Sequence, residues 1–169
     1  MKKVLLLLLL IPATAFSQKQ KPNSNKVATI QSVDKHQAEL TKLSDQVWAF
    51  AETALRETQS AKVLADYAEA QGFKVTRGVA KMPSAFIAEF GSSKPIIGIM
   101  GEYDALPGIS QKAQPTKEPL VPGAAGHGCG HNLFGAGSLG AAVAVKELIE
   151  QGKLKGTVRF YGTPAEESI

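Results

Sequence analysis

The chain has 169 residues, of which 44% are hydrophobic and 20% are charged. This composition is that of an ordinary globular protein and excludes a wholly disordered or fibrous chain. The formal net charge is +4, but Lys2 and Lys3 belong to the N-terminal segment described next. The charge therefore indicates no nucleic-acid partner.

The first 17 residues are typical of a secretory signal peptide. A short basic region precedes an apolar run over residues 4–11, and Ala15 and Ser17 are the small residues expected at a cleavage site before Gln18. The apolar run is shorter than the roughly 20 residues that span a bilayer, so no stable membrane anchor is expected. We expect an exported protein, either periplasmic or secreted.

Residues 18–30 are predicted to form a flexible tether, because their first half is rich in lysine, proline, serine and asparagine. Two amphipathic helices are predicted after it, over residues 30–57 and 58–71, because apolar residues recur there at helical spacing. Ser32 is the predicted cap of the first helix, and Gly72 is predicted to end the second.

Short apolar segments next predict strands over residues 73–79, 84–90 and 95–100. The last of these is almost entirely apolar, which is typical of a strand covered on both faces. Residues 105–126 carry four prolines without periodicity and are predicted to form a long loop of the kind that is usually functional.

A third helix is predicted over residues 131–151 and a further strand over residues 157–161. Helices and buried strands that alternate in this way predict an α/β fold with a mixed or mostly parallel sheet and helices on its faces. In such folds, chemistry collects at the carboxyl ends of the strands.

The segment His127-Gly128-Cys129-Gly130-His131 holds the densest set of metal-binding side chains in the chain. Residues two apart in an extended segment point to the same side, so Cys129 and His131 can converge on one site. A helix that begins near His131 would favour the thiolate of Cys129. The alternative is a buried, inert thiol.

Two acidic pairs follow predicted strands, Glu102 with Asp104 and Glu166 with Glu167. A metal hydrolase needs one carboxylate that holds the ion and another that accepts a proton from water, and such pairs can provide both. Two alternatives remain: adjacent glutamates usually lie on a solvated surface, and the Asp104-Ala-Leu-Pro sequence is also typical of a turn.

Three motifs in this order resemble the M20 family of metal-dependent amidohydrolases and peptidases, in particular its aminobenzoyl-glutamate utilisation B branch. They are Gly-Glu-Tyr-Asp-Ala-Leu-Pro-Gly (101–108), Gly-His-Gly-Cys-Gly-His-Asn-Leu (126–133) and Pro-Ala-Glu-Glu (164–167). The resemblance implies that the metal ligands are Cys129, His131 and Glu167. It further implies that Glu166 is the general base and that Asp104 supports the site from beside the ligands.

Glu102, His127 and Asn132 are also expected beside the metal site. The peptidase branches of the family have a histidine ligand at the position of Glu102, and many members have aspartate at the position of Asn132. The resemblance implies that residues 31–169 form a truncated, N-terminal part of an M20-type catalytic domain.

The implied reaction is hydrolysis of an amide bond in an N-acyl or N-aroyl amino acid, with a small aminobenzoyl-glutamate-like or dipeptide-like substrate. One or two divalent ions, Zn²⁺ or Mn²⁺, are implied as cofactors, and the full-length protein would be a homodimer. Glu166 would take a proton from the attacking water and give it to the leaving amine.

Two other functions remain open from the sequence. Cys129 could be the nucleophile of a hydrolase in which His127 or His131 is the base, although such pairs usually come from distant segments. A catalytically incomplete, secreted fragment that only binds metal or peptide is the non-enzymatic alternative.

Overall fold

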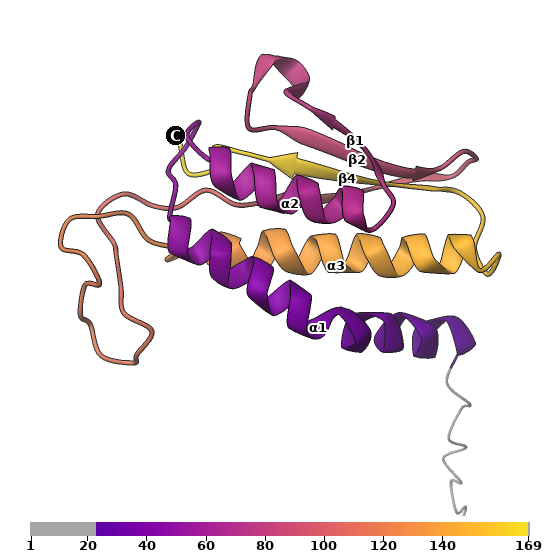
Figure 1. Ribbon diagram of the computed structural model, residues 1–169, viewed down its shortest axis with the longest axis horizontal. Helices are drawn as coiled ribbons and strands as arrows, with labels where there is room; N and C mark the ends of the chain where they lie inside the picture. Colours follow the sequence, from indigo (N-terminus) through magenta and orange to yellow (C-terminus); the bar gives the residue numbers. More distant parts are fainter. Residues whose placement is uncertain (1–22, 169) are drawn as a thin grey trace, which may run out of the picture.

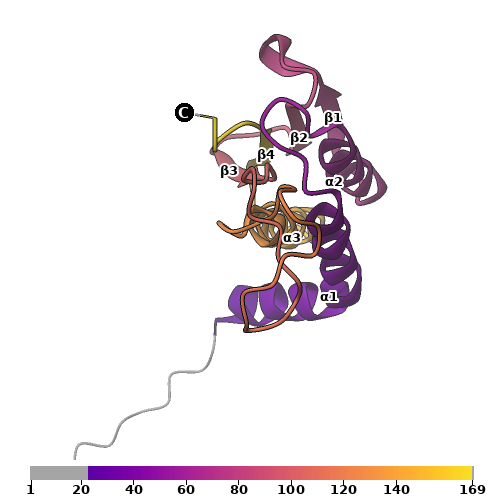
Figure 2. The ribbon, with the colours of Figure 1, turned by 90° about the vertical axis from the view of Figure 1, so that its left-hand side faces the viewer.

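The structure, a computed structural model, describes residues 23–168 and stacks one β-sheet on two layers of helices (Figure 1). The helices are α1 (Ser24–Phe50), α2 (Thr58–Ala70) and α3 (His131–Glu150), with a short 3-10 turn at Val79–Lys81. The strands are β1 (Lys74–Arg77), β2 (Phe86–Gly91), β3 (Ile96–Glu102) and β4 (Thr157–Thr163). Figures 1 and 2 show α2 and α3 against one face of the sheet, with α1 on the far side of α3.

The sheet has the strand order β1-β2-β4-β3. β1 pairs with β2 and β2 pairs with β4 in antiparallel fashion, whereas β3 and β4 are parallel. The predicted α/β class with a mixed sheet is therefore confirmed. Because β3 and β4 run in the same direction, the loops that follow them leave from the same edge of the sheet.

The core lies between the sheet and the helices α2 and α3. Phe86 of β2 and Phe160 of β4 point into it, and Leu64 of α2 and Leu139 of α3 meet them from the other side, all four being almost completely buried. Burying an aliphatic or aromatic side chain of this size contributes roughly 1.5–3 kcal/mol, so these contacts hold the strands on the helical layer.

The expectation that residues 95–100 form a strand covered on both faces is wrong for the part of the chain that the structure describes. β3 pairs there with β4 alone, and Ile96, Ile97 and Met100 are 50%, 54% and 56% exposed. Apolar residues predict burial but do not provide the neighbours that bury them. Within residues 23–168, β3 is consequently an edge strand.

The first helix also differs from its prediction, since it begins at Ser24 and ends at Phe50. The side chain of Asn23 accepts a hydrogen bond from the Asn25 N–H and caps the helix, so residues 24–30 are helical and not part of a tether. Ala51 adopts the left-handed conformation and ends the helix seven residues before α2 begins. The predicted signal peptide and residues 18–22 lie outside the described residues.

Two features of the later chain shape the end of the sheet where its loops gather. Gly135 lies so close to β3 that a Cβ atom there would be 2.7 Å from the Glu102 carbonyl oxygen, so its lack of a side chain lets α3 approach the strand. The predicted long loop over residues 105–126 projects from this end (Figure 1) and is closed by hydrogen bonds between Leu106 and Gly126.

None of the described helices is both long and apolar enough to cross a membrane.

Candidate metal centre

Three segments bring the predicted site residues to one end of the sheet. Glu102 is the last residue of β3, and Asp104 follows it by two positions. His131 is the first residue of α3, and Glu166 and Glu167 follow the end of β4 by three and four positions. The parallel pairing of β3 and β4 explains why acidic residues that are far apart in the sequence meet at the carboxyl ends of the strands.

The imidazole of His131 lies at the centre of this group and is 4% exposed. Its Nδ1 is 2.9 Å from Asp104 Oδ1 and 3.1 Å from the Asp104 carbonyl oxygen, so Nδ1 carries the proton that both oxygens accept. In the neutral ring, Nε2 then has a free lone pair, yet it lies 3.0 Å from Glu102 Oε2. A cation placed there would turn this repulsion into attraction, as at histidines that bind metals.

Asp104 joins two of the predicted metal ligands. Its carboxyl group is 1% exposed, with Oδ1 against the His131 ring and Oδ2 accepting a hydrogen bond of 2.8 Å from the Glu167 N–H. One buried side chain therefore orients the imidazole and the backbone of the Glu-Glu turn together. Such partners fix the tautomer and the orientation of the groups that bind a metal.

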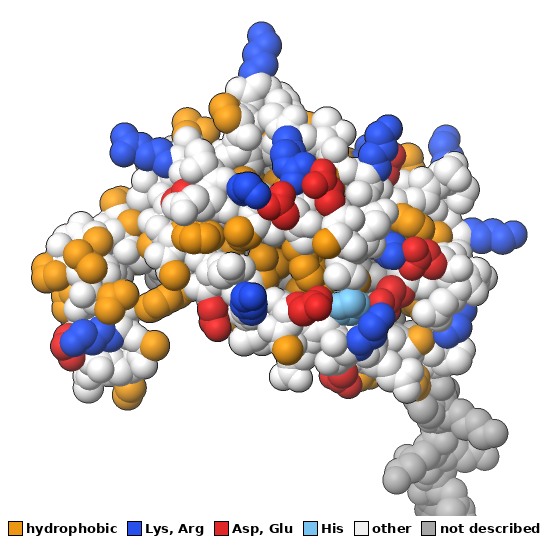
Figure 3. Space-filling view, viewed as in Figure 1, with side chains coloured by type: hydrophobic (Ala, Val, Ile, Leu, Met, Phe, Trp, Pro, Cys, Tyr) orange, Lys and Arg blue, Asp and Glu red, His pale blue; other side chains and the backbone are white. Residues whose placement is uncertain are grey.

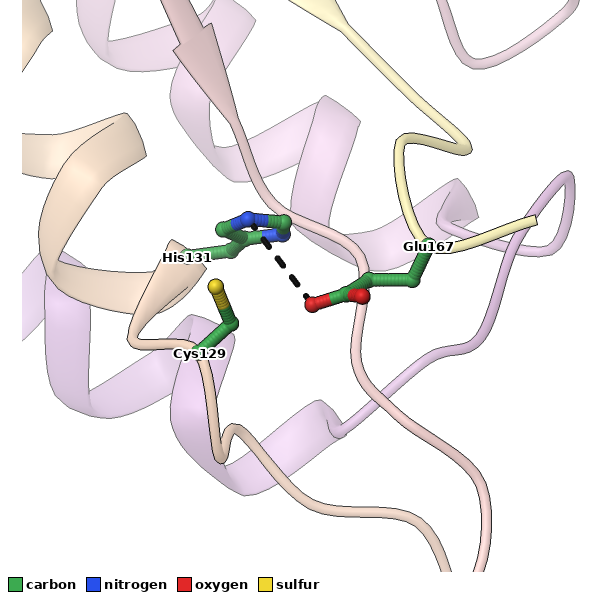
Figure 4. Close-up of side chains that lie close together, drawn as sticks. All are labelled: Cys129, His131 and Glu167. Carbon is green, nitrogen blue, oxygen red and sulfur yellow. Dashed lines mark ion pairs between the residues drawn. The ribbon is translucent and has the colours of Figure 1, made fainter. Parts of the chain in front are cut away.

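The atoms that could bind an ion converge at Cys129, His131 and Glu167 (Figure 4). One atom from each residue, a thiol sulfur, a ring nitrogen and a carboxylate oxygen, lies within 4.8 Å of the other two. Ligands at tetrahedral zinc are roughly 3.3–3.8 Å apart, so a small contraction would close the set. Glu167 Oε1 is buried and has no hydrogen-bond partner in the described chain, which is the situation expected of a metal-ligand oxygen. These residues fit a divalent ion.

A second group of three shares the same histidine. Atoms of Glu102, His131 and Glu166 also lie within 4.8 Å of one another, and Glu166 Oε2 is 3.8 Å from His131 Nε2. The pKa of Glu102 is raised, first by burial and then by the negative charges of Glu166, Asp104 and Glu167, although His131 opposes the shift. Carboxylates crowded in this way favour a cation between them.

The pKa of Cys129 is shifted in the direction opposite to our expectation, which was that the start of a helix favours the thiolate. Cys129 is exposed, and its pKa is raised, by local desolvation and by the negative charges of Glu167, Glu166 and Glu102. This direction is opposite to the one expected from the partial positive charge at the start of α3. A bound metal ion would reverse the balance, because coordination deprotonates a thiol.

His127 and Asn132 lie beside the group but make their hydrogen bonds away from it. His127 Nε2 donates to the carbonyl oxygen of Val47 in α1, at 3.0 Å, and Nδ1 is buried without a partner in the described chain. The Asn132 amide donates to Ser44 Oγ, also in α1. Both residues thus attach the Cys-Gly-His segment to α1.

A cavity of about 350 Å³ opens beneath the projecting loop, between that loop and the end of α1. His127 and Gly128 line it, whereas Cys129, His131 and Glu167 do not, so the cavity adjoins the candidate metal centre without containing it. Its other walls include the apolar residues Trp48, Phe50, Ile109, Leu120 and Val121. Figure 3 shows hydrophobic side chains gathered on this loop.

Glu57 is a residue of this region that the sequence analysis missed. It is completely buried and donates no ligand atom to either group of three, but it accepts a hydrogen bond from Ala165, next to Glu166. A single glutamate at the start of a helix is typical of a solvated surface, and its partner lies 108 residues away. No local pattern could have indicated this contact.

Comparison with known proteins places these motifs in a family. Residues 98–169 match the family described as peptidase family M20/M25/M40. The chain is 53% identical over 130 residues to a subunit of the p-aminobenzoyl-glutamate hydrolase of Escherichia coli (strain K12). That alignment covers 75% of this chain and 27% of the relative.

Two solved structures share the fold. A putative aminohydrolase from methicillin-resistant Staphylococcus aureus superposes with a TM-score of 0.69 at 22% identity, covering 83% of this chain and 35% of that one. The Bacillus subtilis YXEP protein, a dinuclear metal-binding peptidase of the M20 family, gives 0.61 at 30% identity, covering 78% and 36%. The chain spans about a third or less of the length of these proteins, and its resemblance to the M20 family is confirmed.

Proposed function

We propose that this M20-type chain carries part of the active site of a metal-dependent amidohydrolase. The substrate would be an N-acyl or N-aroyl amino acid, either aminobenzoyl-glutamate-like or dipeptide-like. The observation that carries the proposal is the position of Asp104, which contacts both His131 and the Glu167 backbone while Cys129 completes the group. A solvated pair of glutamates would need no such buried partner.

Cys129, His131 and Glu167 would hold a divalent ion. Glu102 and Glu166, which lie near the same Nε2 of His131, would provide carboxylate oxygens to a second ion. Zn²⁺ and Mn²⁺ are the proposed ions, because zinc accepts sulfur, nitrogen and oxygen ligands and manganese suits carboxylates. A bound ion of this kind supplies Lewis acidity and lowers the pKa of water at the site.

Glu166 is the proposed general base. Its side chain is 49% exposed, whereas that of Glu167 is 17% exposed, so Glu166 is the glutamate of the pair that incoming water and substrate can reach. It would take a proton from the attacking water and return that proton to the leaving amine. Asp104 would keep the Nδ1 proton on His131, which leaves Nε2 free to bind the ion.

Similarity to the p-aminobenzoyl-glutamate hydrolase of Escherichia coli supports the aroyl amino acid as the substrate to test first. The Xaa-Arg dipeptidase of Homo sapiens, 29% identical over 163 residues, supports dipeptides as the second class. The complete natural protein should be freed of metal with a chelator and assayed with p-aminobenzoyl-glutamate and with a panel of dipeptides. Activity should disappear with the metal and return with Zn²⁺ or Mn²⁺.

The alternative of a cysteine nucleophile gains no support from the geometry. In residues 23–168 no hydrogen bond joins the Cys129 thiol to His127 or His131, and the raised pKa of Cys129 favours the unreactive thiol. Full activity in the presence of chelator, abolished by a thiol-alkylating reagent, would establish the cysteine mechanism and refute the metal mechanism.

Export of the protein and a homodimeric assembly are further parts of the proposal. Export is supported by the basic, apolar and small residues of positions 1–17. Mass spectrometry of the protein from the cell envelope and medium should find Gln18 as its first residue, and retention of residues 1–17 would contradict export with cleavage. Light scattering of the complete natural protein should give twice the mass of one chain.

A further inference from the structure

The connection between α1 and α2 contains a completely buried carboxyl group that the proposed reaction does not use. Glu57 accepts hydrogen bonds from three donors: the Leu55 N–H and the Ala165 N–H, each 2.9 Å from Oε1, and the Ser84 hydroxyl, 3.0 Å from Oε2. Both oxygens are therefore in use. A buried carboxyl group with this many partners is costly to disturb, because each donor would lose its acceptor inside the protein.

The backbone of Ala165 adopts a conformation that is unfavourable for a residue with a side chain. Its φ of +64° lies in the left-handed region, which residues with a side chain rarely adopt. Such a conformation persists only where the surroundings fix it. The Glu57 carboxyl group provides one of these restraints through the Ala165 N–H.

The other restraint lies two residues further along the turn. Asp104 Oδ2 accepts the Glu167 N–H at 2.8 Å, so buried carboxyl groups hold the backbone on both sides of Glu166. Asp104 comes from the end of β3 and Glu57 from the connection between the helices. The same connection also receives the Ala105 N–H at the Glu52 carbonyl oxygen, at 2.8 Å.

We infer that Glu57 is a positioning residue, which sets the places of Glu166 and Glu167 by holding the Ala165 N–H. This inference rests on the proposed function, in which Glu166 moves a proton and Glu167 holds an ion. Glu57 acts through the backbone of the turn and provides no ligand atom to the candidate metal groups. Its contribution depends on the reach of its side chain and on an acceptor oxygen, not on its charge.

Two substitutions separate reach from charge. Glu57→Gln keeps the length and one acceptor oxygen for the two N–H groups, and its amide can donate to Ser84 Oγ. Glu57→Asp keeps the charge but is one methylene too short to reach Ala165. In the complete natural protein we expect Glu57→Asp to lower kcat and metal affinity by about 10- to 100-fold, and Glu57→Gln to retain both within about threefold.

Ser84→Ala is the matched control for stability, since it removes a donor to Glu57 and leaves the Ala165 contact intact. It should lower the free energy of unfolding without changing kcat or the metal dissociation constant. Equal losses in Glu57→Gln and Glu57→Asp, or a loss of metal affinity in Ser84→Ala as large as in Glu57→Asp, would overturn the inference.

Amide hydrogen exchange tests the same contact without relying on metal, activity or a variant that folds. In the wild-type protein the Ala165 N–H should exchange slowly, like the Leu55 N–H that shares its acceptor. Rapid exchange at Ala165 would overturn the inference. If the wild-type protein hydrolyses no amide, the proposed function fails, whereas the exchange rate of Ala165 still tests whether Glu57 holds the turn.

Discussion

Two buried histidines of this chain lie in polar clusters of opposite character. His36 of α1 has its Nε2 3.0 Å from Glu147 Oε1 of α3, and the ammonium group of Lys35 lies at 3.0 Å from the same oxygen. His131 is surrounded by Glu102, Asp104, Glu166 and Glu167, with no lysine or arginine paired to any of them in the described chain. Acidic, basic and histidine side chains gather over α1 and α3 in Figure 3.

This difference in charge distinguishes the His36 cluster, which stabilises the fold, from the His131 group, which is a candidate metal site. At His36 the partly buried carboxylate of Glu147 is paired with Lys35 and joins α1 to α3. The second carboxylate there, Glu39, lies 3.6 Å from His36 Nδ1 and is exposed to solvent. The carboxylates at His131 exceed the cations available to them and leave Glu167 Oε1 without a partner in the described chain. Surplus negative charge that is held in place by further buried groups is what a cation site requires.

The largest expected effect is at the proposed base. Glu166→Gln keeps the shape and polarity of the side chain but cannot accept the proton, so turnover in the complete natural protein should fall by about 10²- to 10⁴-fold. Metal stoichiometry, measured on the same samples, should stay at the wild-type value. Loss of metal in Glu166→Gln, with metal retained in Glu167→Gln, would mean that the two glutamates have the opposite roles.

A smaller effect, on metal affinity, is expected at Asp104, which contacts both His131 and the backbone of Glu167. Asp104→Asn has a single acceptor oxygen, so it can keep the His131 contact or the Glu167 N–H contact but not both. Metal affinity, measured by competition with a chromophoric chelator, should fall by about 10- to 100-fold. Asp66→Asn, at an exposed carboxylate that pairs with Lys62 and Arg77, is the matched control and should leave the affinity unchanged.

The cluster around His36 and Glu147 should make the free energy of unfolding depend on pH. Burial alone would raise the pKa of Glu147, but hydrogen bonds led by that from His36 outweigh this effect and lower the pKa to about 2. A lowered carboxyl pKa stabilises the fold above the pKa of the unfolded chain, and this stabilisation is lost as the pH falls towards 2.

Between pH 5 and pH 3 the wild-type chain should therefore lose on the order of 2 kcal/mol of unfolding free energy more than Glu147→Gln does. Urea unfolding at the two pH values measures this difference. An equal loss in both proteins would show that Glu147 is not held as an ion by its partners.

The smallest effect is expected at the exposed member of that cluster. The Lys35 side chain is 67% exposed, and ion pairs of such groups contribute about 0–1 kcal/mol. Lys35→Ala should change the free energy of unfolding by no more than about 0.5 kcal/mol, whereas His36→Ala should cost clearly more because it leaves Glu147 without its buried partner. Similar losses in the two variants would remove the distinction between them.

The sequence predicted well what depends on local spacing and strand order. Cys129 and His131 share one side of a short segment, and the acidic residues after β3 and β4 meet because parallel strands end at the same edge. The α/β class follows from the alternation of apolar patterns. The catalytic and ligand roles assigned to Glu166 and Glu167 remain predictions.

The remaining features depend on contacts between distant segments. The position of Glu57 depends on Ser84 and Ala165, and the exposure of β3 depends on which strands pair with it. The raised pKa of Cys129 depends on local desolvation and on the glutamates after β4. The end of α1 at Phe50 likewise reflects the packing of the following connection against Ala105. Periodicity carries no information about such partners.

The central claim, that Cys129, His131 and Glu167 hold a divalent ion, is tested most directly by anomalous X-ray diffraction. Crystals of the complete natural protein grown with Zn²⁺ would be measured on both sides of the zinc absorption edge. The account predicts an anomalous peak in contact with Cys129 Sγ, His131 Nε2 and a carboxylate oxygen of Glu167. A fully loaded protein whose only peaks lie away from these three residues would contradict it.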